Sequence, residues 1–345
     1  MGLNLSYEKS GVNIDVADST KQAMAKSLET DNKRVLNKLG AFASLYDFDF
    51  PKIKNPVLVL KTEEPGSKQK LAYQYDKYES IGFDMINHLV NDIMVMGATP
   101  LTVQDAIICN KIVKEEVNRI VNGVSEACKA NECVLTGGET SEQPGIVSEG
   151  IYILTSSVVG IVDKDKVIDG SKIKEGDIVL AIPSNGVHTN GYSLLRMLMK
   201  EKPEIINQMV GQETFIETIL KPHKGYYKEF KGILQLEGLN GMAHITGGGI
   251  KGNLNRVLPD NLNAIIDISK IKILEIFKFV REIGGVSDED MIKTFNLGVG
   301  LTIVISPNVV DDVRNHLGQF GTDCYEIGTI VKGQKEVEYT GNLTW

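Results

Sequence analysis

The sequence contains few residues of the kinds that mark secreted, disulfide-bonded or membrane-spanning chains. Only 4 of its 345 residues are cysteine, and they form no CxxC pair and have no histidine at zinc-finger spacing. They therefore indicate neither a cysteine-based zinc site nor a disulfide framework. No run approaches the ~18 apolar residues that a membrane helix requires, and residues 1–30 lack the apolar segment of a secretory signal. We expect a reduced cytoplasmic protein.

Positive charge is also scarce, because 37 Lys and Arg face 45 Asp and Glu, for a formal net charge of −8. The basic residues are scattered along the chain. A nucleic-acid partner is therefore disfavoured, since neutralising phosphates requires clustered Lys and Arg. The sequence also has no Walker GxxxxGK[ST] motif and no GxGxxG motif behind a strand, so P-loop and dinucleotide-binding enzymes lack their signatures.

The sequence has many glycines but few prolines, 34 against 10. About one residue in ten is glycine, above the usual ~7%, yet no Gly/Ser tract or fixed repeat is present. The excess must therefore lie in specific turns or loops. At roughly 150 residues per domain, the length predicts two domains.

Apolar patterning predicts alternating strands and helices, which is typical of an α/β fold. A charged and glycine-rich stretch over residues 163–176 places the domain boundary near 165, giving domains of residues 1–165 and 166–345. The expected strands cover residues 56–60, 133–135, 151–162, 178–183, 263–268, 299–306 and 327–332. The expected helices cover residues 82–97, 113–130, 224–237 and 308–319, with others beginning near 190 and 251.

Glycines cluster where the expected strands end, and such loops bind ligands in α/β proteins. Three clusters are Gly137-Gly138, Gly186 with Gly191, and Gly247-Gly248-Gly249. The last leads into a helix, whose free N–H groups and positive dipole end suit a phosphate. A flexible turn is the alternative interpretation of such a triplet.

The expected helix over 82–97 carries a narrow polar stripe on an otherwise apolar surface. The stripe consists of Asp84, Asn87, His88, Asn91 and Asp92. Two carboxylates and two amides without Lys or Arg suit a hard cation such as Mg²⁺, but a plain solvated face would have the same pattern. Both interpretations stay open.

More carboxylates follow at Asp105, Glu139 and Glu142, the last two directly behind Gly137-Gly138. Glycines that admit a phosphate, beside acids that hold its metal, would form a nucleotide site.

Two of the five histidines lie in glycine-rich loops at strand ends. His188 and His244 have hydroxyl and amide neighbours there, so each imidazole could move a proton or simply form hydrogen bonds. His223 follows the helix-breaking Pro222, and we expect His316 on a charged helix surface.

Six segments in this order resemble the phosphoribosylformylglycinamidine cyclo-ligases, also called aminoimidazole ribonucleotide synthetases. They are SYEKSGVNID, IGFDMINHLVNDIMVMGATPL, VLTGGETSEQPG, SNGVHTNGYSLLR, AHITGGG followed by NRVLPD, and KTFNLGVGL. These enzymes share a superfamily with formylglycinamidine ribonucleotide synthetase, thiamine-monophosphate kinase and selenophosphate synthetase. The segments span nearly the whole chain, and SNGVHTNGYSLLR with AHITGGG is specific to the cyclo-ligases.

The resemblance implies an ATP- and Mg²⁺-dependent ring closure in purine biosynthesis, which converts formylglycinamidine ribonucleotide to aminoimidazole ribonucleotide, ADP and phosphate. It also implies an N-terminal α/β domain whose strands complete a barrel with a second subunit of a homodimer. A C-terminal α/β domain with a mixed sheet follows it.

The resemblance further implies roles for particular residues. Nucleotide contacts fall on Glu63, Lys68, Asp92, Gly137, Gly138 and Glu139. Metal ligands fall on Asn91, Asp92 and Asp105. Substrate and phosphate contacts fall on Ser184, Asn190, Gly191, Tyr192, Thr246, Gly247, Gly248 and Gly249. His188 and His244 are the candidate catalytic proton carriers.

Two segments depart from the family pattern. A usual DGVGTK stretch is EEPGSK over residues 63–68, where Pro65 stiffens the loop. A usual GLGGFG stretch is KLGAFA over residues 38–43, where alanine disfavours positive φ. The altered loops keep two alternatives open: a kinase of the superfamily, such as one acting on thiamine monophosphate, and a non-catalytic nucleotide-binding subunit.

Overall fold

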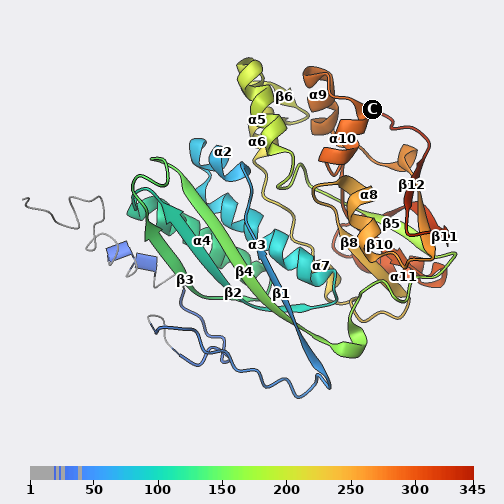
Figure 1. Cartoon of the computed structure of the whole chain (residues 1–345), viewed down its shortest axis with the longest axis horizontal. Helices are drawn as coiled ribbons and strands as arrows, with labels where there is room; N and C mark the ends of the chain where they lie inside the picture. Colours follow the sequence, from blue (N-terminus) through green and yellow to red (C-terminus); the bar gives the residue numbers. More distant parts are fainter. Residues whose placement is uncertain (1–18, 21–22, 25–27, 38–40) are drawn as a thin grey trace, which may run out of the picture. The chain divides into compact units, whose positions relative to one another are not determined.

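The computed structural model describes residues 19–20, 23–24, 28–37 and 41–345 (Figure 1). The SYEKSGVNID segment at residues 6–15 and the first half of KLGAFA lie outside the described residues. The chain divides into two compact units: Met1–Val90 with Pro100–Asp163, and Asn91–Thr99 with Lys164–Trp345. The division falls inside helix α3, Tyr78–Met94, so Asn91 and Asp92 group with the second unit.

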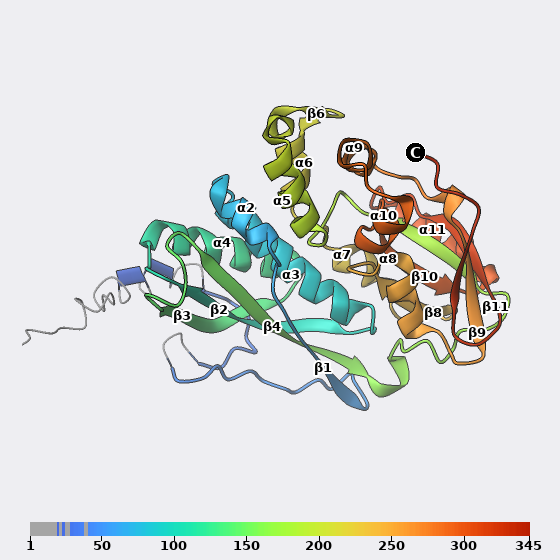
Figure 2. The same ribbon diagram turned by 45° about the horizontal axis from the view of Figure 1, so that its top comes forward.

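The first unit is built on a mixed four-stranded sheet in the order β1-β4-β2-β3. Strand β1 runs antiparallel to β4, and β2 runs parallel to β3. The strands are β1 Pro56–Glu63, β2 Thr99–Cys109, β3 Val134–Glu142 and β4 Tyr152–Asp163. Helices α2, Lys68–Gln74, α3, and α4, Lys114–Ala130, lie on one side of this sheet (Figure 2).

Helices α3 and α4 touch backbone to backbone at two glycines. A Cβ on Gly82 would lie only 2.4 Å from the Val124 backbone nitrogen, and one on Gly123 would overlap the Glu79 carbonyl. Beside this contact Met85 and Leu89 of α3 are fully buried. The apolar residues of the expected 82–97 helix therefore form the core of this unit.

The opposite side of the first sheet carries apolar side chains that remain accessible at its β1 edge. Leu58 and Leu60 alternate along β1 and are 49% and 69% exposed, and Ile153 on β4 is 42% exposed. Ser44 donates its hydroxyl to the Thr136 carbonyl of β3 at 2.7 Å. The segment that precedes β1 therefore passes next to β3.

The second unit is built on a six-stranded sheet in the order β12-β9-β11-β5-β10-β8. Only the β12–β9 pair is parallel among the registered pairs, so this sheet is mixed, as the family resemblance implied. The strands are β5 Ile178–Pro183, β8 Leu239–His244, β9 Leu262–Asp267, β10 Val299–Ile305, β11 Tyr325–Lys332 and β12 Val337–Thr340. A short hairpin pairs β6, Met209–Val210, with β7, Glu213–Thr214.

Helices of the second unit follow the strand ends, and α8 lies beside α10 in both ribbon views (Figures 1 and 2). They are α5 Tyr192–Glu201, α6 Phe215–Ile219, α7 Tyr227–Phe230, α8 Gly249–Leu254, α9 Glu275–Gly284, α10 Asp288–Thr294 and α11 Val310–Gly318. The helix expected over 224–237 is wrong beyond Phe230, where hydrogen-bonded turns follow. One reason is Gly232, a weak helix former whose position lies against the His316 ring.

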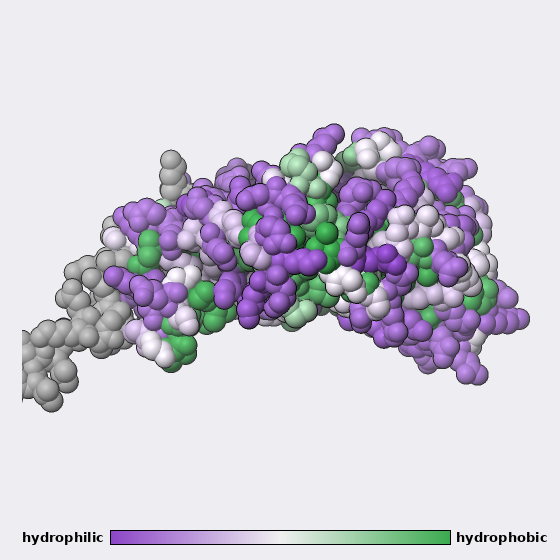
Figure 3. Space-filling view, turned by 90° about the horizontal axis from the view of Figure 1, so that it is seen from above, coloured by the Kyte–Doolittle hydropathy of each residue, from purple (hydrophilic) through white to green (hydrophobic). Residues whose placement is uncertain are grey.

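All four cysteines are free, as expected from the sequence, and all four are buried. Hydrophilic residues dominate the face of the molecule that Figure 3 shows. Among the described residues, no helix combines the length and the apolar character needed to cross a bilayer.

Candidate functional site

Three histidines from separate loops meet in the second unit. His188 lies between β5 and α5, His223 lies between α6 and α7, and His244 ends β8. They are 2%, 1% and 5% exposed. The His188 and His223 rings stack with centroids 3.9 Å apart, and the His223 and His244 centroids are 5.0 Å apart. The sequence predicted a site at His188 and His244 but did not predict the imidazole between them.

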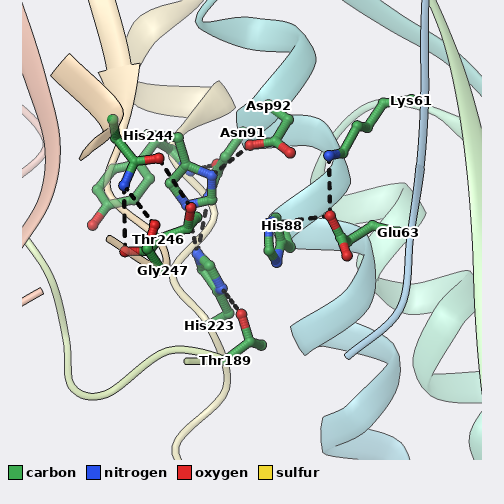
Figure 4. A network of polar contacts seen from close by, with 12 residues as sticks. Lys61, Glu63, His88, Asn91, Asp92, Thr189, His223, His244, Thr246 and Gly247 are labelled. Carbon is green, nitrogen blue, oxygen red and sulfur yellow. Dashed lines mark hydrogen bonds and ion pairs between the residues drawn. The ribbon is translucent and has the colours of Figure 1, made fainter. Parts of the chain in front are cut away.

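A continuous line of polar contacts runs through two of these rings (Figure 4). His244 Nδ1 lies 2.7 Å from Asp92 Oδ1, and His244 Nε2 lies 3.0 Å from His223 Nε2. At the far end, His223 Nδ1 lies 3.4 Å from Thr189 Oγ1. Since a carboxylate accepts, His244 Nδ1 carries a hydrogen and the ring orientation is fixed.

Asn91, one turn from the end of α3, holds the segment that carries His223. Its Nδ2 donates to the Lys224 carbonyl at 2.9 Å and lies 3.3 Å from His223 Nε2. Its Oδ1 accepts the Tyr226 N–H at 3.0 Å. The amide oxygen expected to bind a metal thus already accepts a backbone hydrogen bond. The assignment of Asn91 as a metal ligand remains a prediction.

The loop that carries His188 contains residues with positive φ angles. His188 itself has φ +63°, a left-handed conformation that costs a residue with a side chain about 1–2 kcal/mol. The buried Tyr192 hydroxyl shares its one hydrogen between the Ile219 and His188 carbonyls. Gly191 has φ +81°, and a Cβ there would overlap the Phe295 ring. Such backbone strain persists only where the surroundings enforce it, and it concentrates at functional sites.

The glycine-rich loop after β8 is fixed from inside the second unit. Asn253 donates its Nδ2 to the Gly247 and Gly249 carbonyls at 3.2 and 2.8 Å. A Cβ on Gly249 would overlap the Ile292 carbonyl, and Gly248 has φ +94°. The triplet is therefore a fixed turn that opens α8 at Gly249, and its geometry requires glycine at positions 248 and 249.

An unsatisfied amide group faces this loop. Asn190 Nδ2 is buried and has no hydrogen-bond partner among the described residues, while Asn190 Oδ1 lies 3.4 Å from the point where a Gly247 Cβ would be. A buried donor without an acceptor is costly, so this amide suits an oxygen atom of a bound ligand. Ser184 differs, because its hydroxyl donates to Asn296 Oδ1 at 2.9 Å.

In the first unit, Asp105 on β2 lies directly opposite Gly138 on β3. A Cβ on Gly138 would overlap Asp105 Oδ1, so only glycine leaves room for this carboxylate. Asp105 Oδ2 is buried with no hydrogen-bond partner among the described residues, and burial raises the pKa of Asp105 to about 7. Oxygen of this kind is what a hard divalent cation prefers. Gly137 and Glu139 flank Gly138 on the same strand.

Lys68, which the resemblance assigns to nucleotide contact, forms a buried ion pair in the first unit. Its side chain is fully buried, and its Nζ lies 2.6 Å from Asp84 Oδ1. Burial lowers the pKa of the Lys68 ammonium, and the Asp84 charge partly raises it again. Glu63 lies 3.0 Å from Lys61 Nζ and 3.8 Å from His88 Nε2 (Figure 4). Nucleotide contacts by Glu63 and Lys68 remain predictions.

The polar stripe of α3 is not a solvated face, which corrects one of the two open interpretations. Asp84 and Asn91 are fully buried, and Asn87 and His88 are 7% and 8% exposed. Asn87 Oδ1 accepts from Asn131 Nδ2 at 2.7 Å. The Lys68 ammonium provides a counter-charge for Asp84, which distinguishes this carboxylate from Asp105.

Sequence reasoning missed His223 because its contacts come from distant segments. It lies 21 residues before His244 in the chain, and its nearest sequence feature is a proline. The only signal in the sequence was that His223 lies in a loop of the C-terminal half of the chain, which also contains His188 and His244. His316, expected on a surface, is half-buried and contacts the Glu229 carbonyl at 2.8 Å.

Comparisons with known proteins give one family for both units. Residues 46–162 match the family described as AIR synthase related protein, N-terminal domain, and residues 174–340 match its C-terminal domain. A phosphoribosylformylglycinamidine cyclo-ligase of Alkaliphilus oremlandii is 39% identical over 339 residues, 97% of this chain and 99% of that protein.

Two solved structures have a similar fold. A thiamine-monophosphate kinase from Stenotrophomonas maltophilia matches with a TM-score of 0.69 at 15% identity, covering 95% of this chain and 96% of that chain. The hydrogenase maturation protein HypE in complex with ATP matches with a TM-score of 0.65 at 14% identity, covering 96% and 92%. At these identities the likeness concerns the fold alone. The two-domain α/β fold with mixed sheets that the sequence predicted is confirmed.

Proposed function

Because this chain belongs to the phosphoribosylformylglycinamidine cyclo-ligase family, we propose that it closes the imidazole ring of aminoimidazole ribonucleotide from formylglycinamidine ribonucleotide. ATP activates the formyl oxygen by phosphorylation, the amidine-side nitrogen attacks the formyl carbon, and phosphate leaves with that oxygen. ADP is the other product. The observation that carries this proposal is the 39% identity over nearly the full length of both chains.

ATP is the proposed co-substrate, and Mg²⁺ the proposed metal. A related fold was solved in complex with ATP, which supports nucleotide binding here. Asp105 fits the metal, since it presents a buried, unpartnered carboxylate oxygen beside Gly138. Mg²⁺ held there would offset the negative charge of the phosphates. Asp92 and Asn91 stay proposed ligands, although both already contact other residues.

The second unit would hold substrate and phosphate groups through its two loops. Asn190 supplies a buried amide donor, and Thr246 with the 247–249 glycines supplies a fixed turn at a helix start. His244 is oriented by Asp92, so its imidazole can hold or transfer a proton in a defined direction. Gly191 and Tyr192 fix the backbone of His188, and their proposed substrate contacts stay part of this proposal.

A homodimer through the first unit is also proposed. The β1 edge strand carries Leu58 and Leu60 at 49% and 69% exposure. An exposed apolar edge strand can pair with a strand of another chain unless something covers it. Joining two such sheets at β1 would bury these leucines in a barrel shared by two copies.

The test is a reaction of purified protein with formylglycinamidine ribonucleotide, ATP and Mg²⁺, followed by mass spectrometry of the nucleotide products. We expect aminoimidazole ribonucleotide and ADP in equal amounts. Asn190→Ala should lower turnover or raise KM, whereas Asn315→Ala, an exposed asparagine on α11, should not. Absence of product from folded protein would refute the proposal.

A phosphate-transfer reaction on thiamine monophosphate is the second candidate, supported only by the shared fold of the kinase. Thiamine diphosphate formation in the same assay would favour it over ring closure. A non-catalytic subunit would bind ATP in calorimetric titration and turn over neither substrate.

A further inference from the structure

We propose that His188, His223 and His244 form a binding site for one zinc ion in the second unit. This inference goes beyond the proposed function, because the Mg²⁺ of that function is held by oxygen ligands. It stands on geometry within one unit. A zinc ion on His244 would occupy the ring nitrogen opposite Asp92, so in the zinc-bound protein His244 holds the metal and does not transfer a proton.

The three imidazoles offer ring nitrogens at the required spacing. One ring nitrogen from each histidine lies within 4.8 Å of those from the other two. Zinc binds imidazole nitrogen at about 2.0–2.1 Å, so two nitrogens of a tetrahedral site are ~3.4 Å apart. The His223 Nε2 to His244 Nε2 distance of 3.0 Å is within a few tenths of an ångström of that value.

The groups behind two of the rings are those that support a metal-bound histidine. Asp92 contacts His244 Nδ1 at 2.7 Å, and Thr189 contacts His223 Nδ1 at 3.4 Å. Metal-binding histidines usually give their other ring N–H to a carboxylate or another oxygen. In the metal-free protein one Nε2 can donate a hydrogen to the other, and the Asn91 amide also lies 3.3 Å from His223 Nε2. When both rings carry their hydrogen on Nδ1, both Nε2 lone pairs are available to a cation, which would replace this hydrogen bond.

His188 supplies the third nitrogen after a rotation of its side chain. Its ring now stacks on His223 with an interplanar angle of 18°, so its lone pairs do not yet converge with the other two. Turning the imidazole about its Cβ–Cγ bond directs one nitrogen toward the pair. The strained backbone at φ +63° already holds the residue over the cluster. Water or a ligand oxygen then takes the fourth position.

The donor set selects the kind of metal. Neutral imidazoles suit Zn²⁺ and its neighbours in the transition series, whereas Mg²⁺ requires oxygen. Zinc has no geometric preference of electronic origin, so it tolerates three ligands set by a protein core. All three side chains are at most 5% exposed, so a cation bound here would be shielded from bulk water.

The test uses the full chain without an affinity tag, stripped with a chelator and dialysed against ZnCl₂ in excess Mg²⁺. Elemental analysis should give one zinc per chain. His223→Asn and His188→Asn should weaken binding at least tenfold, and asparagine is suited to position 188 because it tolerates positive φ. His316→Asn, a histidine outside the cluster, should bind zinc like the wild type.

A spectroscopic readout keeps the test decisive if a variant folds poorly. Co²⁺ in the wild-type protein should give the visible absorption of a tetrahedral nitrogen site, and Zn²⁺ should displace it. Less than stoichiometric zinc in the wild type, equal affinity in the folded His223→Asn variant, or displacement of zinc by Mg²⁺ would each overturn the proposal. In the first case a shared proton, rather than a metal, joins the two Nε2 atoms.

Discussion

Replacing Lys68 with methionine separates a structural role for this residue from a nucleotide-binding one. Methionine keeps the apolar stem and removes the ammonium that lies 2.6 Å from Asp84 Oδ1. Both side chains are fully buried, so the Asp84 carboxylate would lose its counter-charge without gaining solvent. Lys68→Met should therefore destabilise the first unit whether or not nucleotide is present.

The magnitude follows from the burial of the pair. Removing one partner of a buried ion pair costs about 3–5 kcal/mol. At roughly 2–4 °C per kcal/mol for a unit of this size, the melting temperature should fall by about 6–20 °C. Replacing both partners, as in Lys68→Met with Asp84→Leu, should restore most of the loss, because a buried pair and an apolar pair are often of similar stability.

The assay is urea and thermal unfolding followed by circular dichroism, with and without ATP and Mg²⁺. Lys61→Met is the matched control, because Lys61 is part of an accessible ion pair with Glu63 at 3.0 Å. Its loss should cost at most about 1 kcal/mol. If Lys68→Met unfolds like the wild type and only raises the KM for ATP, the structural reasoning is refuted and the ammonium binds nucleotide.

Three further expectations follow from particular positions. In metal-free buffer, the free energy of unfolding should fall as pH rises from about 4 to about 7. The reason is that folded Asp105 keeps its proton up to a pH of about 7, whereas the unfolded carboxyl releases it near ~4. Asp105→Asn should therefore reduce the dependence of the unfolding free energy on pH, measured by unfolding at a series of pH values. Gly191→Ala should cost about 1–3 kcal/mol more in urea unfolding than Gly211→Ala, because both have positive φ but only the first meets an aromatic ring. Leu60→Asp should shift the protein to monomer in sedimentation velocity, whereas Met209→Asp, at a residue 60% exposed in the second unit, should not; a dimer unchanged by Leu60→Asp would place the interface elsewhere.

Elements with regular apolar patterns could be predicted from the sequence. The strand expected over residues 178–183 is β5 with the same bounds, and the helix expected over 113–130 is α4 within one residue. Strand β2 was not predicted, because Pro100, Gln104 and Asp105 interrupt its alternation while neighbouring strands supply the hydrogen bonds that sustain it. Tertiary pairing overrides local pattern in such strands.

The candidate site could be predicted only where its residues share a local motif. The loops with His188 and His244 carry glycines that mark them, whereas His223 joins them through contacts that no short pattern encodes. Lys68 shows the reverse limit, since its place in the EEPGSK stretch gave no sign that it would pair with a buried Asp84. Lys68 and Asp84 are 16 residues apart, and they meet because two helices pack together. The residue pattern of a single segment does not reveal such packing.

The four buried cysteines allow the transient unfolding of each unit to be followed separately. Cys109, Cys128 and Cys133 lie in the first unit and Cys324 lies in the second. Burial raises the pKa of Cys109 to about 11 and also raises that of Cys324, so little thiolate forms while the fold is closed. An alkylating reagent would therefore mark only molecules that have transiently unfolded. Mass spectrometry of the labelled peptides would then give a separate opening rate for each half of one unmodified chain.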